Sequence, residues 1–334
     1  MHFLITGHTG FKGAWLSMLL KIQGHKVSGL ALEPTSNSLY TRASLANIFS
    51  NDFRVDIDRE IPKDVIKSNP DVLIHLAAQP LVKESYKNPV STFQTNVIGT
   101  LNVLELTKYL ELSSSLFITT DKVYKISDSK KAYSETDELG GNDPYSASKA
   151  AADIAIQSWR KSFASRPVGI ARAGNVIGGG DFAENRLLPD LVNSYSLSKP
   201  PVLRYPNSIR PWQHVLDCLN GYLHLIDFQA THEISSEWNF GPSKRDRHTV
   251  KEVAEKVGEQ WGQYKNWQAD LLDHEKETAF LMLNSEKSRK ILKWKEKLDF
   301  EEAMNWTSKF YFDDLAGEDP RKLMENQINK FLAI

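Results

Sequence analysis

The sequence predicts an α/β fold, in which a smaller α/β lobe is interleaved with a doubly wound parallel sheet. Two observations support this prediction. Short apolar runs alternate with longer amphipathic segments through the first half of the chain, which is typical of parallel strands joined by covering helices. A glycine-rich turn also follows the first apolar run. The 334 residues, 41% of them hydrophobic, are enough for a large core and two lobes.

Five apolar runs are interpreted as buried strands of the sheet. They are HFLITG (2–7), KVSGLAL (26–32), DVLIHLAA (71–78), SLFITTD (115–121) and PVGIARAGN (167–175). The segments between them carry helical patterns; Phe93, Val97, Leu101 and Leu104 recur at intervals of four, four and three residues. This order predicts that ligands bind at the carboxyl ends of the strands.

The composition of the chain changes after Asn175. Loop-rich and arginine-containing stretches follow, and new helical patterns begin near Thr249 and Phe300. We therefore expect residues 1–171 to form the sheet domain, to which a segment near 212–240 returns. Residues 172–334 should form mainly the second lobe.

Charge and composition exclude several classes of function. The 41 Lys plus Arg and 42 Asp plus Glu residues nearly cancel, so no basic surplus indicates nucleic acid. Cys218 is the single cysteine, which excludes an internal disulfide or a cysteine-based metal cluster. No apolar run approaches the roughly 20 residues that span a bilayer, and glycines interrupt the apolar N-terminus. We expect a cytoplasmic protein with no membrane partner and no metal.

The stretch LITGHTGFKGAWL places Gly7, Gly10 and Gly13 between a strand and a helix. Glycines at these positions permit a tight turn and let the backbone approach a pyrophosphate, which the helix N-terminus attracts. Position at the start of a strand–helix–strand series strengthens the motif. The sequence thus predicts a Rossmann dinucleotide site, with NAD as the expected cofactor.

The second predicted strand ends near an acid that is harder to interpret. Glu33 either holds the adenine ribose hydroxyls or is an exposed loop carboxylate. No basic residue follows at once, which favours NAD, although Arg42 keeps NADP open. Asp56 is expected to meet the adenine amino group.

Tyr145 and Lys149 are separated by four residues on a strongly helical segment, DPYSASKAAAD. This spacing puts both side chains on one helix face. A neighbouring ammonium favours the phenolate, so Lys149 is expected to lower the pKa of Tyr145. Such pairs are common by chance, but with the glycine motif this one indicates hydride-transfer chemistry.

Taken together, TGHTGFKG, HLAAQ, TNVIGT, TTDKVY, YSASK and RAGNVIGGGD resemble motifs of the extended short-chain dehydrogenases that act on nucleotide sugars, the NAD-dependent epimerases and dehydratases. The resemblance runs to about Tyr311 and implies bound NAD, a tyrosine base, a substrate-binding hydroxyl at Thr120 and a homodimer or homotetramer. The cofactor contacts it implies, with those argued above, are Gly7, Thr9, Gly10, Phe11, Gly13, Glu33, Asp56, Ile57, Ala77, Ala78, Gln79, Asn96, Tyr145 and Lys149.

Asp121 and Lys122 directly follow the hydroxyl of Thr120. An Asp-Lys dipeptide is ordinarily a weak surface pair. The resemblance is strongest to the 4,6-dehydratase branch of the family, which must also remove a proton from carbon 5 and expel the hydroxyl of carbon 6. It implies that Asp121 protonates the departing oxygen. Lys122 is then either the carbon 5 base, if its amine is neutral, or a residue that orients Asp121 or the sugar.

Several polar side chains beyond Gly174 are candidates for holding a nucleotide diphosphate, since arginine donates bidentately to phosphate. They are Asn175, Arg186, Arg204, Arg210 and His214. The resemblance favours CDP-glucose as the substrate, and leaves open GDP-, UDP- or dTDP-linked hexoses. A 4-epimerase or reductase, and a catalytically silent NAD-binding regulator, are the competing interpretations.

Overall fold

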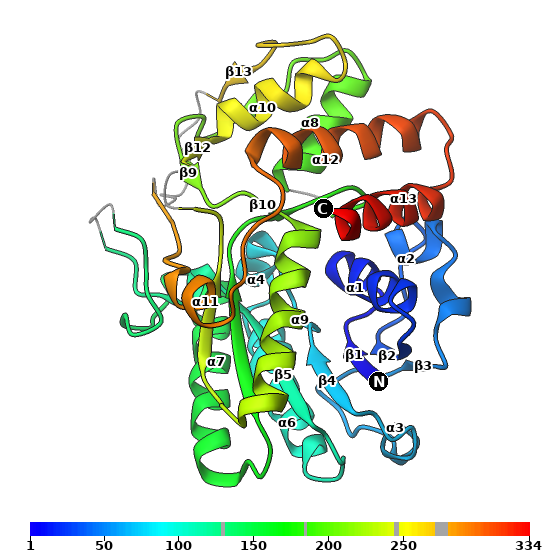
Figure 1. The fold of residues 1–334 in the computed structure, drawn as a ribbon. Helices are drawn as coiled ribbons and strands as arrows, with labels where there is room; N and C mark the ends of the chain where they lie inside the picture. Colours follow the sequence, from blue (N-terminus) through cyan, green and yellow to red (C-terminus); the bar gives the residue numbers. More distant parts are fainter. Residues whose placement is uncertain (128–130, 184–185, 244–246, 271–279) are drawn as a thin grey trace.

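A seven-stranded, entirely parallel sheet forms the centre of the computed structural model, which describes residues 1–127, 131–183, 186–243, 247–270 and 280–334 (Figure 1). The strand order is β11-β6-β5-β4-β1-β2-β3. The strands are β1 (His2–Thr6), β2 (Lys26–Ala31), β3 (Asn51–Arg54), β4 (Val72–His75), β5 (Ser114–Thr120), β6 (Val168–Ala173) and β11 (Glu237–Phe240). The predicted doubly wound sheet and its five predicted strands are confirmed.

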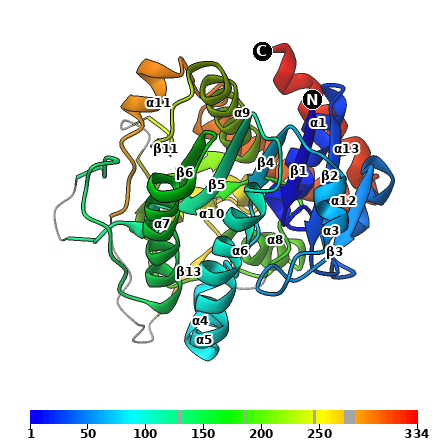
Figure 2. The ribbon, with the colours of Figure 1, turned by 90° about the horizontal axis from the view of Figure 1, so that it is seen from below.

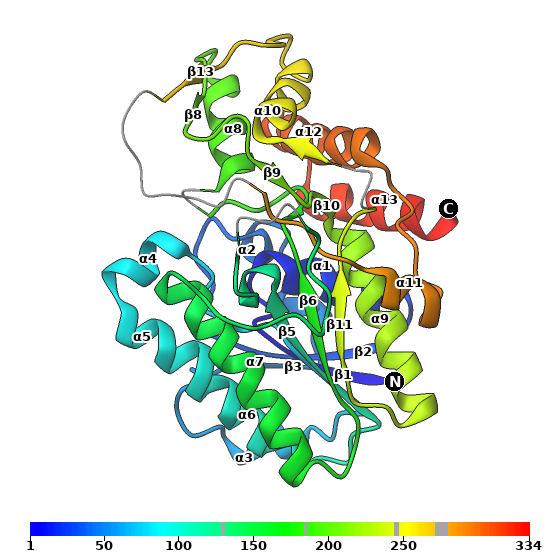
Figure 3. The ribbon, with the colours of Figure 1, turned by 90° about the vertical axis from the view of Figure 1, so that its left-hand side faces the viewer.

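Helices cover both faces of this sheet (Figures 2 and 3). On one face lie α1 (Phe11–Ile22), α9 (Val215–His232) and α13 (Pro320–Ala333), and their apolar side chains share one core cluster with the sheet. The opposite face carries α3 (Lys63–Lys67), α6 (Thr100–Thr107) and α7 (Pro144–Phe163), with a second core cluster. Burial on both faces explains why the strands are continuous apolar runs.

The helical pattern from Phe93 to Leu104 is not one regular helix. α4 (Val82–Lys87) and α5 (Pro89–Phe93) precede a π-helical stretch at Gln94–Gly99, after which α6 begins. Thr92 and Asn96, on either side of the α5 end, both bond to Gln79 in the loop after β4. This irregular segment therefore fixes the loop that runs past the carboxyl end of β4.

The second lobe sits above the carboxyl ends of the strands and has its own apolar core (Figure 1). Its helices are α8 (Leu187–Ser196), α10 (Val250–Glu259) and α12 (Phe300–Leu315). Short strand pairs complete it: β8 (Val202–Leu203) with β13 (Gln268–Ala269), and β9 (Ile209–Arg210) with β12 (His248–Thr249). The remaining elements are α2 (Leu39–Arg42), the 3₁₀ turns Leu45–Ile48 and Asp121–Val123, the pair β7 (Val176–Ile177) and β10 (Gln213–His214), and α11 (Glu286–Ile291).

Two strands of the sheet were not predicted from the sequence. β3 is the polar tetrapeptide NDFR, half-buried throughout, and β11 is the tetrapeptide EWNF. Neither is long enough to show a strand pattern by itself. β11 pairs with β6 after the chain has passed through the first part of the second lobe. Within the described ranges, no helix has the length and apolar content needed to cross a bilayer.

Candidate active site

The glycine turn between β1 and α1 is built for a close approach of backbone and ligand. Gly7 has φ +73°, and a Cβ there would lie 2.7 Å from the backbone nitrogen of Ala77. A Cβ on Gly13 would lie 2.2 Å from the carbonyl oxygen of Gly7. Gly10 caps α1 without any side-chain bond to the first turn. The first N–H groups of the helix are therefore available to an anion, so these residues fit a dinucleotide pyrophosphate.

A cavity of about 1250 Å³ extends from this turn into the second lobe. Most of the predicted cofactor residues line it, together with all five predicted catalytic residues. The cofactor residues in its wall are Gly7, Thr9, Gly10, Phe11, Gly13, Asp56, Ile57, Ala77 and Ala78. Gln79 and Asn96 do not line it. Asn96 instead accepts a hydrogen bond from the Gln79 N–H at 2.8 Å and donates to Ser148 Oγ at 2.9 Å, so it braces the cavity wall from behind.

Glu33 does not line the cavity either. Its side chain is 79% exposed, and its Oε2 lies 3.3 Å from Nε of Arg54. Arg54 pairs in turn with Asp52 at 2.7 Å, and Asp52 also bonds to His8 at 2.7 Å. Arg42, the residue that kept NADP open, pairs with Asp314 at 2.5 Å. The basic residue beside Glu33 is thus Arg54, which the sequence analysis missed because it lies 21 positions further along the chain.

β5 ends at Thr120, and a single 3₁₀ turn then carries Asp121 and Lys122. The Thr120 hydroxyl donates to Asp121 Oδ1 at 2.9 Å, and the Lys122 N–H bonds to the same hydroxyl at 3.4 Å. Asp121 is 2% exposed, and burial raises the pKa of its carboxyl against the opposing charge of Lys122. Its Oδ2 has no hydrogen-bond partner among the described residues. A buried acid with one free oxygen thus lines the cavity beside the amine of Lys122.

α7 presents Tyr145 and Lys149 to the same space. Asp143 caps the helix by accepting the Ser146 N–H at 2.9 Å, so Tyr145 lies in the first turn. Lys149 Nζ donates to the carbonyl oxygen of Ile118 at 2.9 Å. Burial raises the pKa of Tyr145 to about 12, and burial lowers the pKa of Lys149 to about 8. The expected lowering of the Tyr145 pKa by Lys149 is not observed, since the ammonium is directed to β5 and burial of the phenol dominates.

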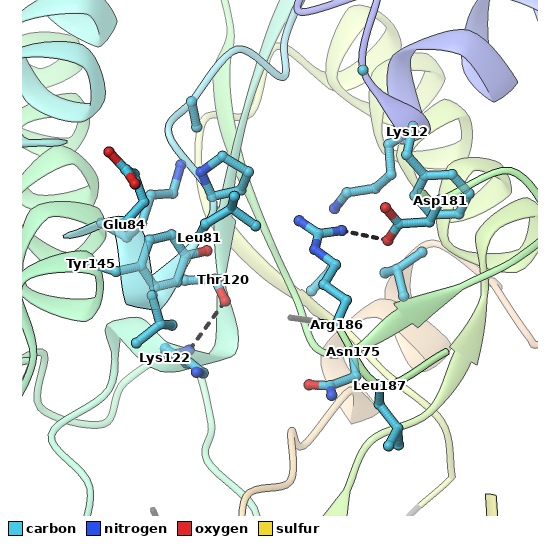
Figure 4. Close-up of a pocket in the computed structure, with 18 of the residues that line it drawn as sticks. Lys12, Leu81, Glu84, Thr120, Lys122, Tyr145, Asn175, Asp181, Arg186 and Leu187 are labelled. Carbon is cyan, nitrogen blue, oxygen red and sulfur yellow. Dashed lines mark hydrogen bonds and ion pairs between the residues drawn. The ribbon is translucent and has the colours of Figure 1, made fainter. Parts of the chain in front are cut away.

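Arginines from the second lobe face this group across the cavity. Arg186 pairs with Asp181 at 2.7 Å (Figure 4), and Asn175, Arg204 and Arg210 also line the wall. His214 does not. It is 1% exposed, its Nδ1 accepts the Leu216 N–H at 3.3 Å as the cap of α9, and burial lowers its pKa to about 3.

Lys12, Glu84 and Asp181 line the cavity as well, and the sequence analysis named none of them. Lys12 lies inside the glycine motif, but only the glycines of that motif have a spacing that indicates a function. Asp181 was hidden in a loop-rich stretch, although its spacing of five from Arg186 is visible in the sequence. Glu84 carries no recognisable signal.

The parallel sheet, the glycine turn and the tyrosine–lysine pair define a dinucleotide-dependent enzyme class that exchanges hydride with a hydroxyl-bearing substrate. A profile described as "NAD dependent epimerase/dehydratase family" matches residues 3–241. The chain belongs to this family, which is NAD-dependent.

Curated relatives and solved structures extend the match to nearly the whole chain. CDP-glucose 4,6-dehydratase of Salmonella typhimurium is 36% identical over 98% of this chain and 95% of its own. dTDP-glucose 4,6-dehydratase of Haemophilus influenzae is 27% identical over 93% of this chain and 98% of its own. The crystal structure of dTDP-glucose 4,6-dehydratase from Bacillus anthracis in complex with NAD has a TM-score of 0.80 at 25% identity, covering 97% and 99% of the two chains.

Proposed function

We propose that this protein is a nucleotide-sugar 4,6-dehydratase that converts CDP-glucose to CDP-4-keto-6-deoxyglucose with bound NAD. The observation that carries the proposal is the position of Asp121 and Lys122, which line the same cavity as Tyr145 and Lys149. One group suits oxidation at carbon 4, and the other suits loss of water from carbons 5 and 6.

Tyr145 is the proposed base of the first half-reaction. Its phenolate would accept the proton of the carbon 4 hydroxyl, which the Thr120 hydroxyl helps to position. Lys149, held at the Ile118 carbonyl, supplies a positive charge on the same helix face. Bound NAD would supply the acceptor for the carbon 4 hydride and the donor of that hydride to carbon 6. The glycine turn and the cavity wall from Asp56 to Ala78 would hold the cofactor.

Asp121 is the proposed acid of the elimination. Its raised pKa favours the protonated carboxyl that must donate to the departing carbon 6 oxygen. Thr120 occupies its Oδ1, which leaves Oδ2 for the substrate. Lys122 is the proposed acceptor of the carbon 5 proton. This role requires the neutral amine of Lys122. Its Nζ lies 6.0 Å from the ring centre of Tyr145, so elimination and oxidation would act on adjacent atoms of one sugar.

The nucleotide diphosphate would lie along the second lobe. Arg186, Arg204 and Arg210 bring three guanidinium groups to one side of the cavity, where each can donate bidentately to phosphate. The choice of cytidine rests on the 36% identity to CDP-glucose 4,6-dehydratase over almost the full length of both chains.

The test is incubation of the purified protein with CDP-, dTDP-, UDP- and GDP-glucose in parallel. CDP-glucose should yield a product lighter by one water, with the alkaline absorbance of a 4-keto-6-deoxy sugar. A Tyr145→Phe preparation is the control for contaminating activity. Conversion of any of these sugars to its carbon 4 epimer at unchanged mass would identify an epimerase. Preference for another nucleotide would overturn only the cytidine assignment.

A further inference from the structure

The first turn of α7 leaves the backbone N–H of Tyr145 without a partner inside its own helix. α7 begins at Pro144, so Tyr145 is its second residue, and the first N–H groups of a helix have no carbonyl one turn behind them. The Asp143 side chain accepts the N–H of Ser146, the third residue, at 2.9 Å. The N–H of the proposed base must therefore be bonded from outside the helix and its cap.

Ser85 of α4 supplies this bond. Its Oγ accepts the Tyr145 N–H at 3.1 Å and donates to the carbonyl oxygen of Val82, in its own helix, at 2.6 Å. The hydroxyl proton is thus directed to Val82, which leaves the oxygen lone pairs for Tyr145. Ser85 is fully buried and does not line the cavity, whereas its neighbours Glu84 and Tyr86 do. Ser85 can therefore act on the reaction only through the backbone of Tyr145.

The carbonyl oxygen of Tyr145 is also held from outside the first turn. Ser148 Oγ donates to this oxygen at 2.7 Å and accepts from Asn96 Nδ2 at 2.9 Å. Asn96 bonds to both backbone groups of Gln79, and the Gln79 side chain bonds to both backbone groups of Leu81, the residue before α4. The N–H and the carbonyl of Tyr145 are thus tied, by separate routes, to the loop that follows β4.

The same loop forms part of the expected cofactor site. Its residues Ala77 and Ala78 line the cavity, and Figure 4 shows Leu81 and Glu84 on the same side of the cavity as Tyr145. The proposed oxidation needs the phenol and the cofactor at one sugar carbon, and a misplacement of about 1 Å can cost about 100-fold in rate. A bond that fixes the first turn of α7 to this wall therefore bears on the rate of oxidation.

We propose that Ser85 is a positioning residue, which fixes the first turn of α7 so that the Tyr145 phenol meets the carbon 4 hydroxyl. This role rests on the proposed function, in which Tyr145 is the base. Without the Ser85 hydroxyl, the Tyr145 N–H has no acceptor, and the Asp143 cap alone holds the N–H groups of this turn. The phenol then spends less of its time in the reactive position, although the residues that line the cavity are unchanged.

The test compares Ser85→Ala and Ser85→Thr with the wild type. In Ser85→Ala, kcat and the single-turnover rate of NADH formation should fall about 10-fold to 100-fold, while KM and the affinity for NAD stay unchanged. Hydrogen exchange, measured by mass spectrometry on peptides that contain Tyr145, should be about 10-fold faster at this amide because its acceptor is gone. Ser85→Thr keeps a hydroxyl that can bond the preceding turn of its helix, and it should restore both the rate and the protection.

Ser308→Ala is the matched control. Ser308 is another buried serine, whose hydroxyl donates to the Met304 carbonyl oxygen of α12 at 2.8 Å, and it does not line the cavity. This variant should leave kcat and the exchange at Tyr145 unchanged. An equal loss of kcat in Ser308→Ala would overturn the proposal, because removing any buried hydroxyl would then have the same effect.

Three other results would also overturn it. They are an unchanged kcat in Ser85→Ala, a raised KM at unchanged kcat, and a Ser85→Thr variant as slow as Ser85→Ala. Failure of the dehydratase assignment would be seen separately, in the sugar panel. Hydrogen exchange uses no sugar nucleotide, and a 4-epimerase would need the same oxidation by Tyr145, so the role of Ser85 is tested with either reaction.

Discussion

The hydroxyl of Thr120 donates a hydrogen bond to Oδ1 of Asp121, 2.9 Å away, at the point where β5 ends. The residue proposed to bind the carbon 4 hydroxyl is thus bonded to the residue proposed to protonate the carbon 6 oxygen. Because both lie on one short turn, whatever fixes the sugar at carbon 4 also fixes the acid near carbon 6. In the proposed mechanism, the two half-reactions therefore depend on the same short turn of backbone.

Loss of Asp121 or Lys122 should separate oxidation from elimination. Asp121→Asn keeps the shape but removes the proton needed at carbon 6, and Lys122→Met keeps the length but removes the amine. Enzyme-bound NADH should rise in a single turnover while product formation falls about 100-fold to 10,000-fold. Stopped-flow absorbance with product quantification measures both. Wild-type product rates in both variants would make the pair a simple ion pair and remove the main support for dehydration.

Replacing Tyr145 with Phe should nearly abolish turnover while NAD still binds. The phenyl ring keeps the packing at the start of α7, but no group remains to take the carbon 4 proton, so the single-turnover rise in NADH should also disappear. Calorimetric titration with NAD gives the control for an intact site. A residual rate above about a tenth of the wild type would exclude Tyr145 as the base, because general base catalysis contributes at least about 100-fold.

The rate of carbon 4 oxidation should depend on pH through Tyr145 and Lys149. The phenol pKa of about 12 means that the phenolate fraction, and with it the rate, rises with pH. The Lys149 pKa of about 8 means that its ammonium is lost above pH 8. The positive charge that Lys149 supplies on the helix face of Tyr145 is then lost, so the rise in rate should flatten there. Lys149→Arg stays charged and should move the flattening to higher pH. The first phase of single-turnover traces at pH 6 to 10 measures this; an identical profile in both proteins would contradict it.

Asp153 should be among the most costly residues to truncate. Its carboxylate is fully buried and accepts two bonds from Arg172, at 2.7 and 2.8 Å, and one from Thr119 at 2.9 Å. Asp153→Ala leaves the Arg172 charge buried without its partner, so unfolding free energy should fall by about 3–5 kcal/mol. Urea denaturation followed by circular dichroism measures it. The double variant Asp153→Leu with Arg172→Met should lose less than Asp153→Ala alone.

A dimer is expected through the helices α5, α6 and α7. The outer surfaces of α5 and α7 expose large apolar side chains, including Val90 at 81%, Ile154 at 54% and Phe163 at 59%, and α5 and α6 both contact α7. Apolar exposure of this kind marks association surfaces, and homo-oligomers are usually two-fold symmetric. Sedimentation at micromolar concentration should give a dimer or a tetramer, and Val90→Glu with Ile154→Glu should shift it to monomer. A monomeric wild type would refute the prediction.

The sequence predicted the fold wherever burial on both faces produced long apolar runs. β1, β2, β4, β5 and β6 are such runs, and the helices that begin at Val250 and Phe300 follow capping residues that the local pattern displays. β3 and β11 were not predicted because each is a four-residue segment that contains polar residues. Such a segment becomes a strand only by pairing with an adjacent strand. Tertiary pairing decides such segments, and no local pattern contains it.

The site was predictable where a residue type and a spacing define chemistry, as for Tyr145 with Lys149 and for the three glycines. It was not predictable where the role of a residue depends on the direction in which its side chain points. His214 turns into the core to cap α9. Glu33 turns outward to Arg54. Lys12 turns inward to Tyr222. Each of these directions is set by packing between elements distant in sequence.

The pairing of β11 with β6 bears on how the chain is synthesised. When the ribosome has made the chain as far as Ala173, the end of β6, the backbone groups on the outer side of this strand have no partner, because Glu237–Phe240 does not yet exist. An unpaired strand edge invites contact with other chains. The incomplete sheet therefore exposes an unpaired strand edge, at which other chains can bind, until about 70 more residues have emerged. A shortened protein that ends before Phe240 should aggregate rather than persist as an independent NAD-binding unit.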